Sequence, residues 1–259
     1  MKTDIIYNAD SILAIPDLVE DNSVDLIIAD PPFAIDFKKK KQNYNRKVEY
    51  VLDGYAEIPK KDYPDFTMNW IKEAHRVLKN NGSIYIFSGW NNLEDILRAL
   101  RLNNFYTINQ LIWKYNFGVY TKRKFVNSHY NILYVSKKAN GYKFNREAFY
   151  CDGDESNGLK LNYLHRQSVW NISREYWRGI YKPQTKLPRE IVEKMMFYSS
   201  DIGDIILDPF MGSGQVPFIA SEYGRRFVGF ELGKEIFEFA KYRIENNDYY
   251  GKGFNLKEG

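Results

Sequence analysis

Short apolar runs that alternate with helical patterns are the feature that most constrains how this chain can fold. Seven segments have the composition of strands, several of them as near-continuous apolar runs: 5–7, 24–29, 83–87, 106–113, 130–135, 205–207 and 227–230. Runs of that kind belong to a sheet that is covered on both faces. Helical patterns lie between most of them, at 66–78, 191–196, 215–223 and 236–244. This order predicts right-handed crossovers and a doubly wound, mostly parallel α/β sheet.

Two stretches break the alternation. No helical pattern separates the runs at 106–113 and 130–135, so we expect an antiparallel hairpin at one edge of the sheet. Residues 139–181 lose periodicity, and we interpret them as a small insertion carried by the core. The expected organisation is one half of a core in 1–138, an insertion in 139–181 and the other half of the same core in 182–259.

Composition excludes several classes of protein. The single cysteine, Cys151, excludes an internal disulfide framework, and no second thiol or clustered histidine accompanies it. We therefore expect a metal-free protein of a reducing, cytoplasmic compartment. The sequence shows neither a signal-peptide apolar region nor a membrane-length apolar run, so no membrane partner is expected. The net charge of +4 is too small to identify a partner by itself.

The distribution of charge is more informative than its total. Basic residues are concentrated in two blocks flanked by aromatic residues: Lys38, Lys39, Lys40, Lys41, Arg46 and Lys47 in the first, and Lys122, Arg123 and Lys124 in the second. Surfaces that bind splayed or single-stranded nucleic acid combine phosphate attraction with base stacking in this way. A plain solvated loop is the alternative for either block alone.

One apolar run ends in unusual chemistry. Residues 24–29 lead into Asp30, Pro31, Pro32 and Phe33. The prolines hold φ at about −65° and have no N–H, so the carbonyls around them stay free for a ligand. A carboxylate, a rigid backbone and an aromatic ring could together hold a planar base that carries an amino group. The alternative is an ordinary strand-ending turn with a capping Asp30 and a core Phe33.

A second motif follows the run at 205–207. Its residues are Asp208, Pro209, Phe210, Met211, Gly212, Ser213 and Gly214. Glycines between a strand and a helix let a ligand approach the backbone, and the helix N-terminus offers free N–H groups. The next strand ends in Glu231, where an acid can accept hydrogen bonds from both hydroxyls of a ribose. A helix-packing turn and a solvated acid are the alternatives, because the third glycine of the dinucleotide fingerprint is absent.

The two motifs are expected to share one crevice. In an open α/β sheet, ligands bind outside the carboxyl ends of the strands, near the switch in strand order. A nucleoside-containing cofactor could therefore lie beside Asp30. The cofactor turn comes late in the chain and Asp30 early, which a circular permutation of a doubly wound domain allows.

These motifs and their order resemble the permuted beta group of S-adenosylmethionine-dependent DNA amino-methyltransferases. The resemblance rests on DPPF early, DPFMGSG late and an acid at the end of the following strand, and it spans nearly the whole chain except 139–181. It implies a circularly permuted, seven-stranded Rossmann-like sheet and S-adenosylmethionine as cofactor. It also implies methyl transfer to the N6 amino group of an adenine flipped out of double-stranded DNA. The N4 amino group of cytosine and an amino group in RNA are the nearest alternatives as acceptors.

The resemblance also implies roles for individual residues. Asp30, Pro31, Pro32 and Phe33 would hold and stack on the target base. The cofactor would be held by Asp10, Asp30, Thr185, Lys186, Asp208, Phe210, Gly212, Ser213, Gly214 and Glu231. The chain departs from the family pattern at Ala9, which replaces a glycine, and in KPQTKLP at 182–188, which lacks a leading histidine and has one extra residue. Gln215 and Val216 stand where the family commonly has two threonines.

Residues 139–181, with the loop at 116–127, are the expected recognition segment. Within it, Trp170, Arg174, Trp177 and Arg178 are candidates for DNA contacts, although Trp and Arg also serve subunit interfaces. A homodimer and a companion restriction endonuclease are left open. Two other classes compete with the enzyme: a noncatalytic DNA-binding protein on the same scaffold, and a nicotinamide dehydrogenase, which would leave DPPF unexplained.

Overall fold

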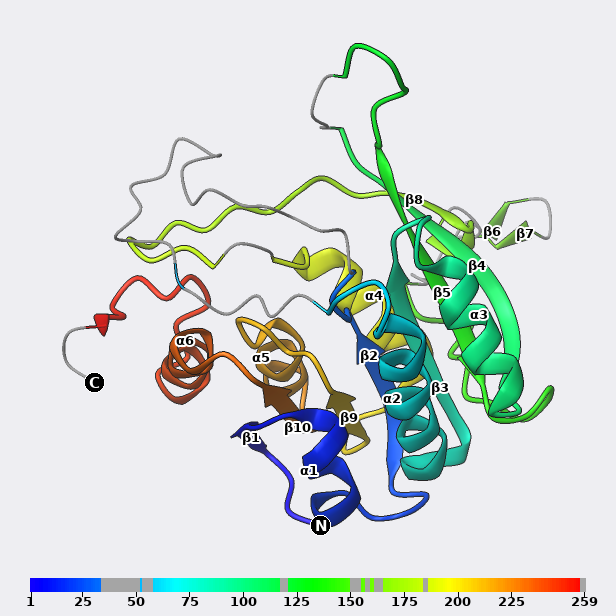
Figure 1. Cartoon of the computed structure of the whole chain (residues 1–259), viewed down its shortest axis with the longest axis horizontal. Coiled ribbons are helices and arrows are strands. Elements are labelled where there is room, and N and C mark those ends of the chain that lie inside the picture. Colours follow the sequence, from blue (N-terminus) through cyan, green and yellow to red (C-terminus); the bar gives the residue numbers. More distant parts are fainter. Residues whose placement is uncertain are drawn as a thin grey trace.

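The computed structural model describes residues 1–33, 52, 58–116, 121–149, 155–156, 159–160, 165–183 and 186–256. The first basic block, with Lys38, Lys39, Lys40, Lys41 and Arg46, lies outside these residues, as does Thr185. The described elements form three layers, with helices on both faces of a central sheet (Figure 1).

The elements alternate along the chain much as the sequence indicates. The first half contains β1 (Ile5–Asn8), α1 (Ser11–Leu18), β2 (Val24–Ala29), α2 (Tyr63–Val77), β3 (Leu78–Ser88), α3 (Leu93–Leu102), β4 (Tyr106–Lys114) and β5 (His129–Ser136). The second half contains β6 (Glu155–Ser156), β7 (Leu159–Lys160), β8 (Val169–Asn171), α4 (Arg189–Ser199), β9 (Ile205–Asp208), α5 (Gln215–Glu222), β10 (Arg226–Glu231) and α6 (Lys234–Glu245).

The main sheet has eight strands in the order β1-β10-β9-β2-β3-β5-β4-β8. The first five of these run parallel, and β5 is antiparallel to both of its neighbours, β3 and β4. The doubly wound sheet and the β4–β5 hairpin are thus confirmed. The expected count of seven strands is one too low, because β8 pairs in parallel with β4 and forms the edge of the sheet. Its three residues are too few to produce a periodic pattern.

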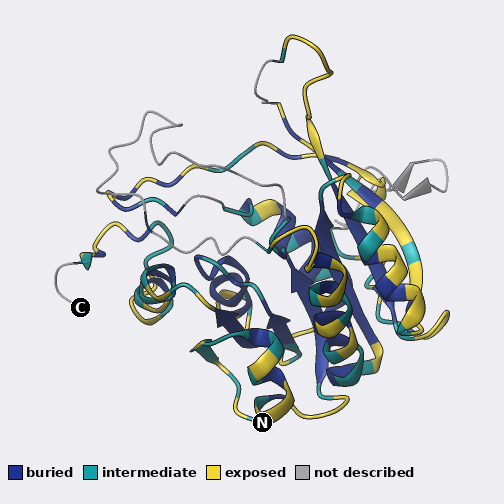
Figure 2. Cartoon of the chain, viewed as in Figure 1, coloured by how far each residue is buried: buried dark blue, intermediate teal, exposed yellow. Residues whose placement is uncertain are grey.

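Both faces of the central strands are buried. In β2, Ile27 and Ala29 pack with α1, α2 and α3, whereas Leu26 and Ile28 face the layer that contains α4 and α5. Successive side chains of a strand point to opposite faces, so a strand between two helical layers must be apolar at every position. Figure 2 shows the resulting dark core along β2 and β3.

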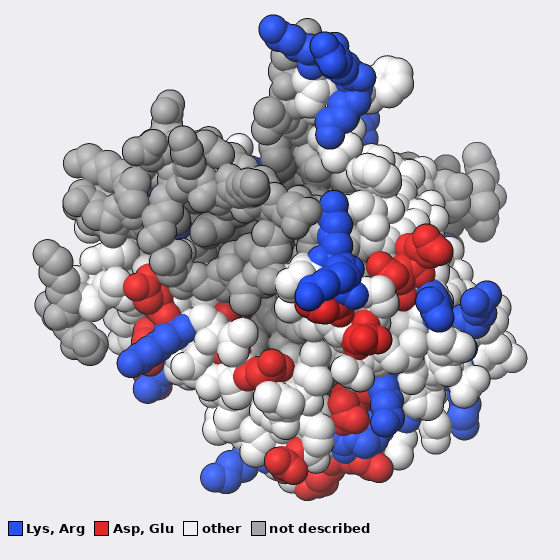
Figure 3. Space-filling model, viewed as in Figure 1, with Lys and Arg blue, Asp and Glu red and all other residues white. Residues whose placement is uncertain are grey.

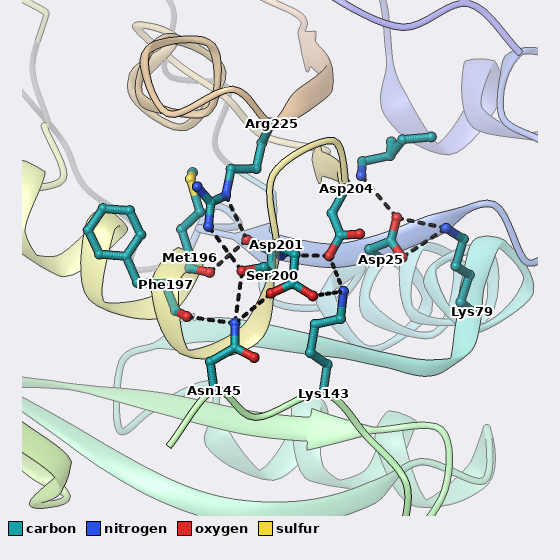
Figure 4. A network of polar contacts seen from close by, with 11 residues as sticks. Asp25, Lys79, Lys143, Asn145, Met196, Phe197, Ser200, Asp201, Asp204 and Arg225 are labelled. Carbon is teal, nitrogen blue, oxygen red and sulfur yellow. Dashed lines mark hydrogen bonds and ion pairs between the residues drawn. The ribbon is translucent and has the colours of Figure 1, made fainter. Parts of the chain in front are cut away.

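A cluster of polar residues lies at the edge of the sheet where β2, β3 and β9 begin (Figure 4). Asp25 in β2 accepts hydrogen bonds from Ile205 N at 3.0 Å and from Lys79 Nζ at 2.8 Å. Lys143, just after β5, forms ion pairs with Asp201 and Asp204. These contacts join the starts of three strands at the edge opposite the two sequence motifs.

Asn145 extends this cluster to the end of α4. Its amide donates to the carbonyls of Phe197 and Ser200, both at 3.1 Å, and to Asp201 Oδ1 at 2.9 Å. Phe144 stacks on Tyr198 with ring centroids 5.1 Å apart. The beginning of the 139–181 segment is therefore packed on the core, as is its later part through β8.

Candidate active site

The two sequence motifs lie side by side at the switch in strand order. β2 and β9 are paired neighbours, with Leu26 beside Ile206 and Ile27 beside Leu207. After β2 the chain continues through α2 to β3 on one side, and after β9 it continues through α5 to β10 on the other side. α2 and α5 cover opposite faces (Figure 1). Such a divergence leaves room for a ligand at the carboxyl ends of the two central strands.

Asp30 is the first residue beyond β2, and its carboxylate points to no hydrogen-bond donor within the described part of the chain. Among the residues that the structure describes, none donates a hydrogen bond to this side chain or to the carbonyl of Pro31. Asp30 keeps partial contact with solvent, yet desolvation by the surrounding protein raises its pKa to about 7. Two hydrogen-bond acceptors at this strand end are therefore available to a ligand that brings donors.

Phe33 lies on an aromatic wall beside these acceptors. Its ring is tilted against Tyr130 of β5, with the centroids 5.5 Å apart, and Tyr130 in turn contacts Trp113 and Tyr115. Asn91 Nδ2 donates to the carbonyl of Phe33 at 3.5 Å. Tyr130, Trp113 and Tyr115 were not predicted as site residues, because each reads as an ordinary strand aromatic in the sequence. Together these contacts fix Phe33 as one wall of the site.

We call residues 208–214 the glycine turn. Met211 N donates to Phe230 O at 2.9 Å, which fastens the turn to β10. Gly212 and Gly214 have backbone φ angles of 50° and 75°, values that residues with a side chain rarely adopt. A Cβ on Gly212 would meet nothing within 4 Å, so the backbone there is open to a ligand, whereas one on Gly214 would meet Ala240 Cβ at 2.9 Å. An open backbone before a helix N-terminus suits the polar and anionic groups of a nucleoside cofactor.

Asp208 and Phe210 shape the floor of the glycine turn. Asp208 Oδ1 accepts a hydrogen bond from Phe210 N at 3.1 Å. Burial, reinforced by the nearby charges of Asp30 and Glu231, holds the pKa of Asp208 well above its ordinary value. Phe210 packs against Phe66 and edge-on against Trp70, at centroid distances of 5.8 and 5.6 Å.

Glu231 and Asp10 stand at neighbouring strand ends. Glu231 Oε1 accepts a hydrogen bond from Gly233 N at 2.7 Å, and burial raises its pKa to about 6 although backbone N–H groups, including that of Gly212, oppose the shift. Asn8 in β1 pairs with Glu231 in β10, so Asp10 follows close beside it. Asp10 caps α1 by accepting from Ile12 N at 2.9 Å. The structure thus brings Asp10, Asp30, Asp208 and Glu231 to one edge of the sheet.

Lys186 lies apart from these acids. Its side chain is buried, forms an ion pair with Glu175 at 2.7 Å and lies over the rings of Trp177 and Tyr249. Desolvation lowers its pKa to about 8, and the bond to Glu175 opposes that shift. Its amine is therefore already engaged by protein groups, which the sequence did not predict.

The predicted DNA contacts separate into exposed and buried groups. Lys122, Arg123 and Lys124, which we call the basic tip, are exposed in the connection between β4 and β5. Figure 3 shows Lys and Arg side chains gathered at the projecting end of that connection. Arg178 is exposed but lies over the ring of Tyr250. Burial raises the pKa of Tyr115, and the charge of the nearby Arg174 partly opposes that rise.

The expectation that Trp170 and Trp177 contact DNA is wrong in this structure. Trp170 is 5% exposed, within the core beside β4, and its Nε1 donates to Gln167 O at 2.9 Å. Trp177 is 8% exposed and packs edge-on against Phe239. Both rings serve the packing of the 139–181 segment on the core, which their spacing in the sequence does not reveal.

Among the described residues, no group of three or more His, Cys, Asp and Glu could hold a metal ion. In the same part of the chain, no helix is both long and apolar enough to cross a membrane.

The doubly wound sheet, with an open glycine turn beside the acid that ends β2, has the architecture of an enzyme that binds a nucleoside cofactor. The model of the DNA methylase family N6_N4_Mtase matches residues 24–242. The chain belongs to this family.

Two relatives are similar over most of the chain. The type II methyltransferase M.HpaI of Haemophilus parainfluenzae is 31% identical, over 88% of this chain and 70% of its own length. The DNA adenine methyltransferase YhdJ of Escherichia coli K12 is also 31% identical, over 88% of this chain and 78% of its own.

Solved structures share the fold. The M1.HpyAVI–SAM complex has a TM-score of 0.64 at 23% identity, covering 92% of this chain and 98% of that chain. The cytosine-N4-specific PvuII DNA methyltransferase has a TM-score of 0.72 at 16% identity, covering 96% and 88%. Proteins with this fold therefore include one solved with the cofactor and one that acts on cytosine.

Proposed function

We propose that this DNA methyltransferase transfers the methyl group of S-adenosylmethionine to the N6 amino group of adenine in double-stranded DNA. The observation that carries the proposal is the pair of acceptors at the end of β2, the Asp30 carboxylate and the Pro31 carbonyl, next to the glycine turn. An exocyclic amino group has two N–H donors and needs two such acceptors. The adenine methyltransferase named among the relatives supports adenine as the base.

Residues of the chain would activate the amino group by position. The lone pair of that nitrogen is delocalised into the ring, so it is a poor nucleophile until hydrogen bonds draw the nitrogen toward a tetrahedral geometry. Asp30 and the Pro31 carbonyl would accept those two bonds and aim the lone pair at the methyl carbon. Asp30 accepts its hydrogen bond most readily when it is ionised, and its pKa of about 7 places that ionisation near neutral pH.

Phe33 would stack on the flipped base. The contact with Tyr130 fixes its ring, so the base would meet a preformed wall. Flipping costs roughly a few kcal/mol of lost stacking in the duplex, and the new stack on Phe33 offsets part of it.

The cofactor would be held by the edge of the sheet that the acids and the glycine turn form. Glu231 would accept hydrogen bonds from the ribose hydroxyls, and the N–H groups around Gly212 would face polar groups of the ligand. When bound, S-adenosylmethionine supplies an electrophilic methyl group whose bond to sulfur breaks as the new bond to nitrogen forms. The methylated nitrogen then loses a proton, for which an ionised Asp30 is a nearby acceptor.

DNA would be held by exposed and half-buried cations. We assign phosphate contacts to the basic tip and to Arg174 and Arg178, and sequence recognition to 139–181 as a segment separate in role from the two halves of the core. The basic block at 38–46 and Thr185 keep the roles that the sequence predicts for them. A companion restriction endonuclease and a homodimer stay predictions from the sequence, and a type II methyltransferase among the relatives is compatible with the first.

Cytosine N4 is the second candidate acceptor. The structural likeness to the cytosine-N4-specific PvuII enzyme favours it, and two acceptors suit either amino group.

The deciding experiment identifies the methylated nucleoside. The protein is incubated with DNA of mixed sequence and methyl-labelled S-adenosylmethionine, and the DNA is digested and separated into nucleosides. We expect the label in N6-methyladenine, and label in N4-methylcytosine would instead establish the second candidate. Asp30→Ala should lose transfer by at least about a hundredfold while still binding cofactor. Bound cofactor without label in DNA from the wild-type protein would contradict the proposed function and favour a noncatalytic DNA-binding role.

A further inference from the structure

A buried arginine outside the predicted site holds the glycine turn. Arg243 in α6 is fully buried, and its guanidinium donates to Ser213 O, to Gln215 Oε1 at 3.0 Å and to Tyr249 O at 3.0 Å. Two of these three acceptors flank Gly214, the residue with φ of 75° that packs on Ala240 of the same helix. α6 thus holds the glycine turn through the hydrogen bonds of Arg243 and through the close packing of Gly214 on Ala240.

Gln215 carries the contact onward to a distant segment. Its Nε2 donates to Tyr249 Oη at 2.6 Å, and the Tyr249 hydroxyl donates to Glu175 Oε2 at 2.7 Å. Glu175 also accepts from Lys186 Nζ at 2.7 Å and from Arg189 N at 2.9 Å. We call Arg243, Gln215, Tyr249, Glu175 and Lys186 the Arg243 cluster. It joins the glycine turn to both sides of the segment at 182–188.

Stability alone is a weak reason for this arrangement. Burying a guanidinium and an ammonium is expensive, and well-packed apolar side chains often replace buried ions without loss of stability. Desolvation lowers the pKa of Arg243 to about 10, and its cation lies over the ring of Trp177 at 4.8 Å. Fixed hydrogen bonds give what apolar packing does not, namely a defined direction for the Ser213 carbonyl and the N–H groups beside it.

We propose that Arg243 and Gln215 are positioning residues for the cofactor, and that the hydrogen bonds from Gln215 through Tyr249 to Glu175 tie the shape of the glycine turn to the 175–189 segment. The inference rests on the proposed placing of S-adenosylmethionine at the glycine turn.

The test measures cofactor affinity separately from turnover. Tyr249→Phe removes one hydroxyl and keeps the ring, and Arg243→Lys keeps the charge but cannot span Ser213 and Gln215 together. Calorimetry with S-adenosylhomocysteine should show Kd raised about three- to tenfold in Tyr249→Phe and more in Arg243→Lys. The KM for S-adenosylmethionine should rise by the same factor, with kcat changed less than about twofold.

A double variant tests whether the residues act through one path. Gln215→Ala and Tyr249→Phe both break the same hydrogen bond, so combining them should raise Kd little beyond Gln215→Ala alone. Effects on Kd that simply multiply would contradict the path from Gln215 to Glu175.

A matched control separates position from general stability. Asn145→Ala removes hydrogen bonds at the opposite edge of the sheet and should lower the Tm while leaving Kd unchanged. Equal Kd in the wild-type protein and every folded variant of the Arg243 cluster would overturn the inference and leave the proposed function standing. A wild-type protein that binds no S-adenosylhomocysteine would overturn both. If Arg243→Lys does not fold, Tyr249→Phe and Gln215→Ala decide the outcome.

Discussion

At the scale of single residues, three carboxyl groups of the candidate site are harder to ionise than ordinary ones. Asp30, Asp208 and Glu231 all have raised pKa values, chiefly because burial disfavours their charged forms. Hydrogen-bond donors from a bound base and a ribose would favour the ionised forms again. Without ligands, ionising these three carboxylates is therefore costly, and bound hydrogen-bond donors would lower that cost.

The first prediction concerns Asp30→Asn and pH. The pKa of Asp30 is higher in the folded protein than in the unfolded chain, so its contribution to stability is fully present below about pH 4 and is lost as the pH rises through about 7. The neutral amide has no such loss. Asp30→Asn should therefore gain stability relative to the wild-type protein as the pH rises from 5 to 8, by at most about 1.4 kcal/mol per pH unit. Urea unfolding at several pH values measures the difference.

Asp201→Asn is the matched control for this pH dependence. Its hydrogen bond with Lys143 is the leading cause that lowers the pKa of Asp201, so its contribution to stability is present above the ordinary aspartate pKa and is lost only as the pH falls. The stability difference for this variant should be flat between pH 5 and 8. A flat difference for Asp30→Asn as well would show that the Asp30 pKa is not raised.

The second prediction concerns the ring of Phe33. Phe33→Ala should lower the kcat/KM of methyl transfer by about tenfold or more, because stacking on a base contributes roughly 1–3 kcal/mol. Phe33→Tyr keeps the stacking face and the contact with Tyr130, so it should retain most of the activity. Fluorescence of 2-aminopurine at the target position measures flipping directly. Equal fluorescence and rates in all three proteins would remove the stacking role.

At the scale of elements, the described residues 122–128 of the connection between β4 and β5 are all exposed. This connection joins two long paired strands, and the basic tip stands at its end with Phe125 97% exposed beside it (Figure 3). Cations that point into solvent gain most of their interaction energy from phosphates rather than from the protein.

The third prediction concerns the basic tip. Replacing Lys122, Arg123 and Lys124 together by serine should weaken DNA binding and reduce the slope of log Kobs against log salt by about 2–3. Three exposed cations of α2 and α3, Lys72, Arg98 and Arg101, provide a control of equal charge whose replacement should leave the slope unchanged. Fluorescence anisotropy over a range of salt concentrations gives both slopes. The same slope in the tip variant and the wild-type protein would show that the basic tip is a solvated loop that does not contact DNA phosphates.

At the scale of the whole molecule, the side of the sheet where the parallel strands end differs in its contacts from the side where they begin. The edge at the strand ends brings acids and open backbone together, whereas the edge at the strand starts carries the ion pairs and hydrogen bonds of Figure 4. Stabilising contacts on one edge allow uncompensated groups on the other, since the total stability of a domain is only about 5–15 kcal/mol.

The fourth prediction places this division under test. Asn145→Ala removes several hydrogen bonds between the segment after β5 and the end of α4, so it should destabilise the protein by about 1–3 kcal/mol. Its kcat below the melting transition should equal that of the wild-type protein. Thermal unfolding and initial rates check the two halves of the prediction, and a parallel loss of kcat would show that the edges are coupled.

Local patterns in the sequence were enough to predict most of the fold and where the central residues of the candidate site lie. The apolar run of β2 and the glycines of the turn are signals made of consecutive residues. The ends of β2 and of the strand before the turn could therefore be located from the sequence. Because parallel strands share one carboxyl edge, Asp30 and Asp208 could also be placed together, and the pairing of β2 with β9 confirms it.

Contacts between distant residues could not be predicted. Tyr249 and Glu175 lie 74 positions apart, and neither carries a local signal for its partner. The burial of Trp170 depends on the pairing of β8 with β4, and the three residues of β8 are too few to predict that pairing. These features depend on side chains that meet only after the sheet has formed.

The pairing of β1 with β10, and of β2 with β9, sets the order in which the protein can be completed during synthesis. A nascent chain that has emerged from the ribosome as far as β8 has no partner strand for β1 and no neighbour on one side of β2. Both gaps close only after β9 and β10 have emerged, so the acid at the end of β2 stays without the glycine turn beside it until residues 205–231 have been synthesised.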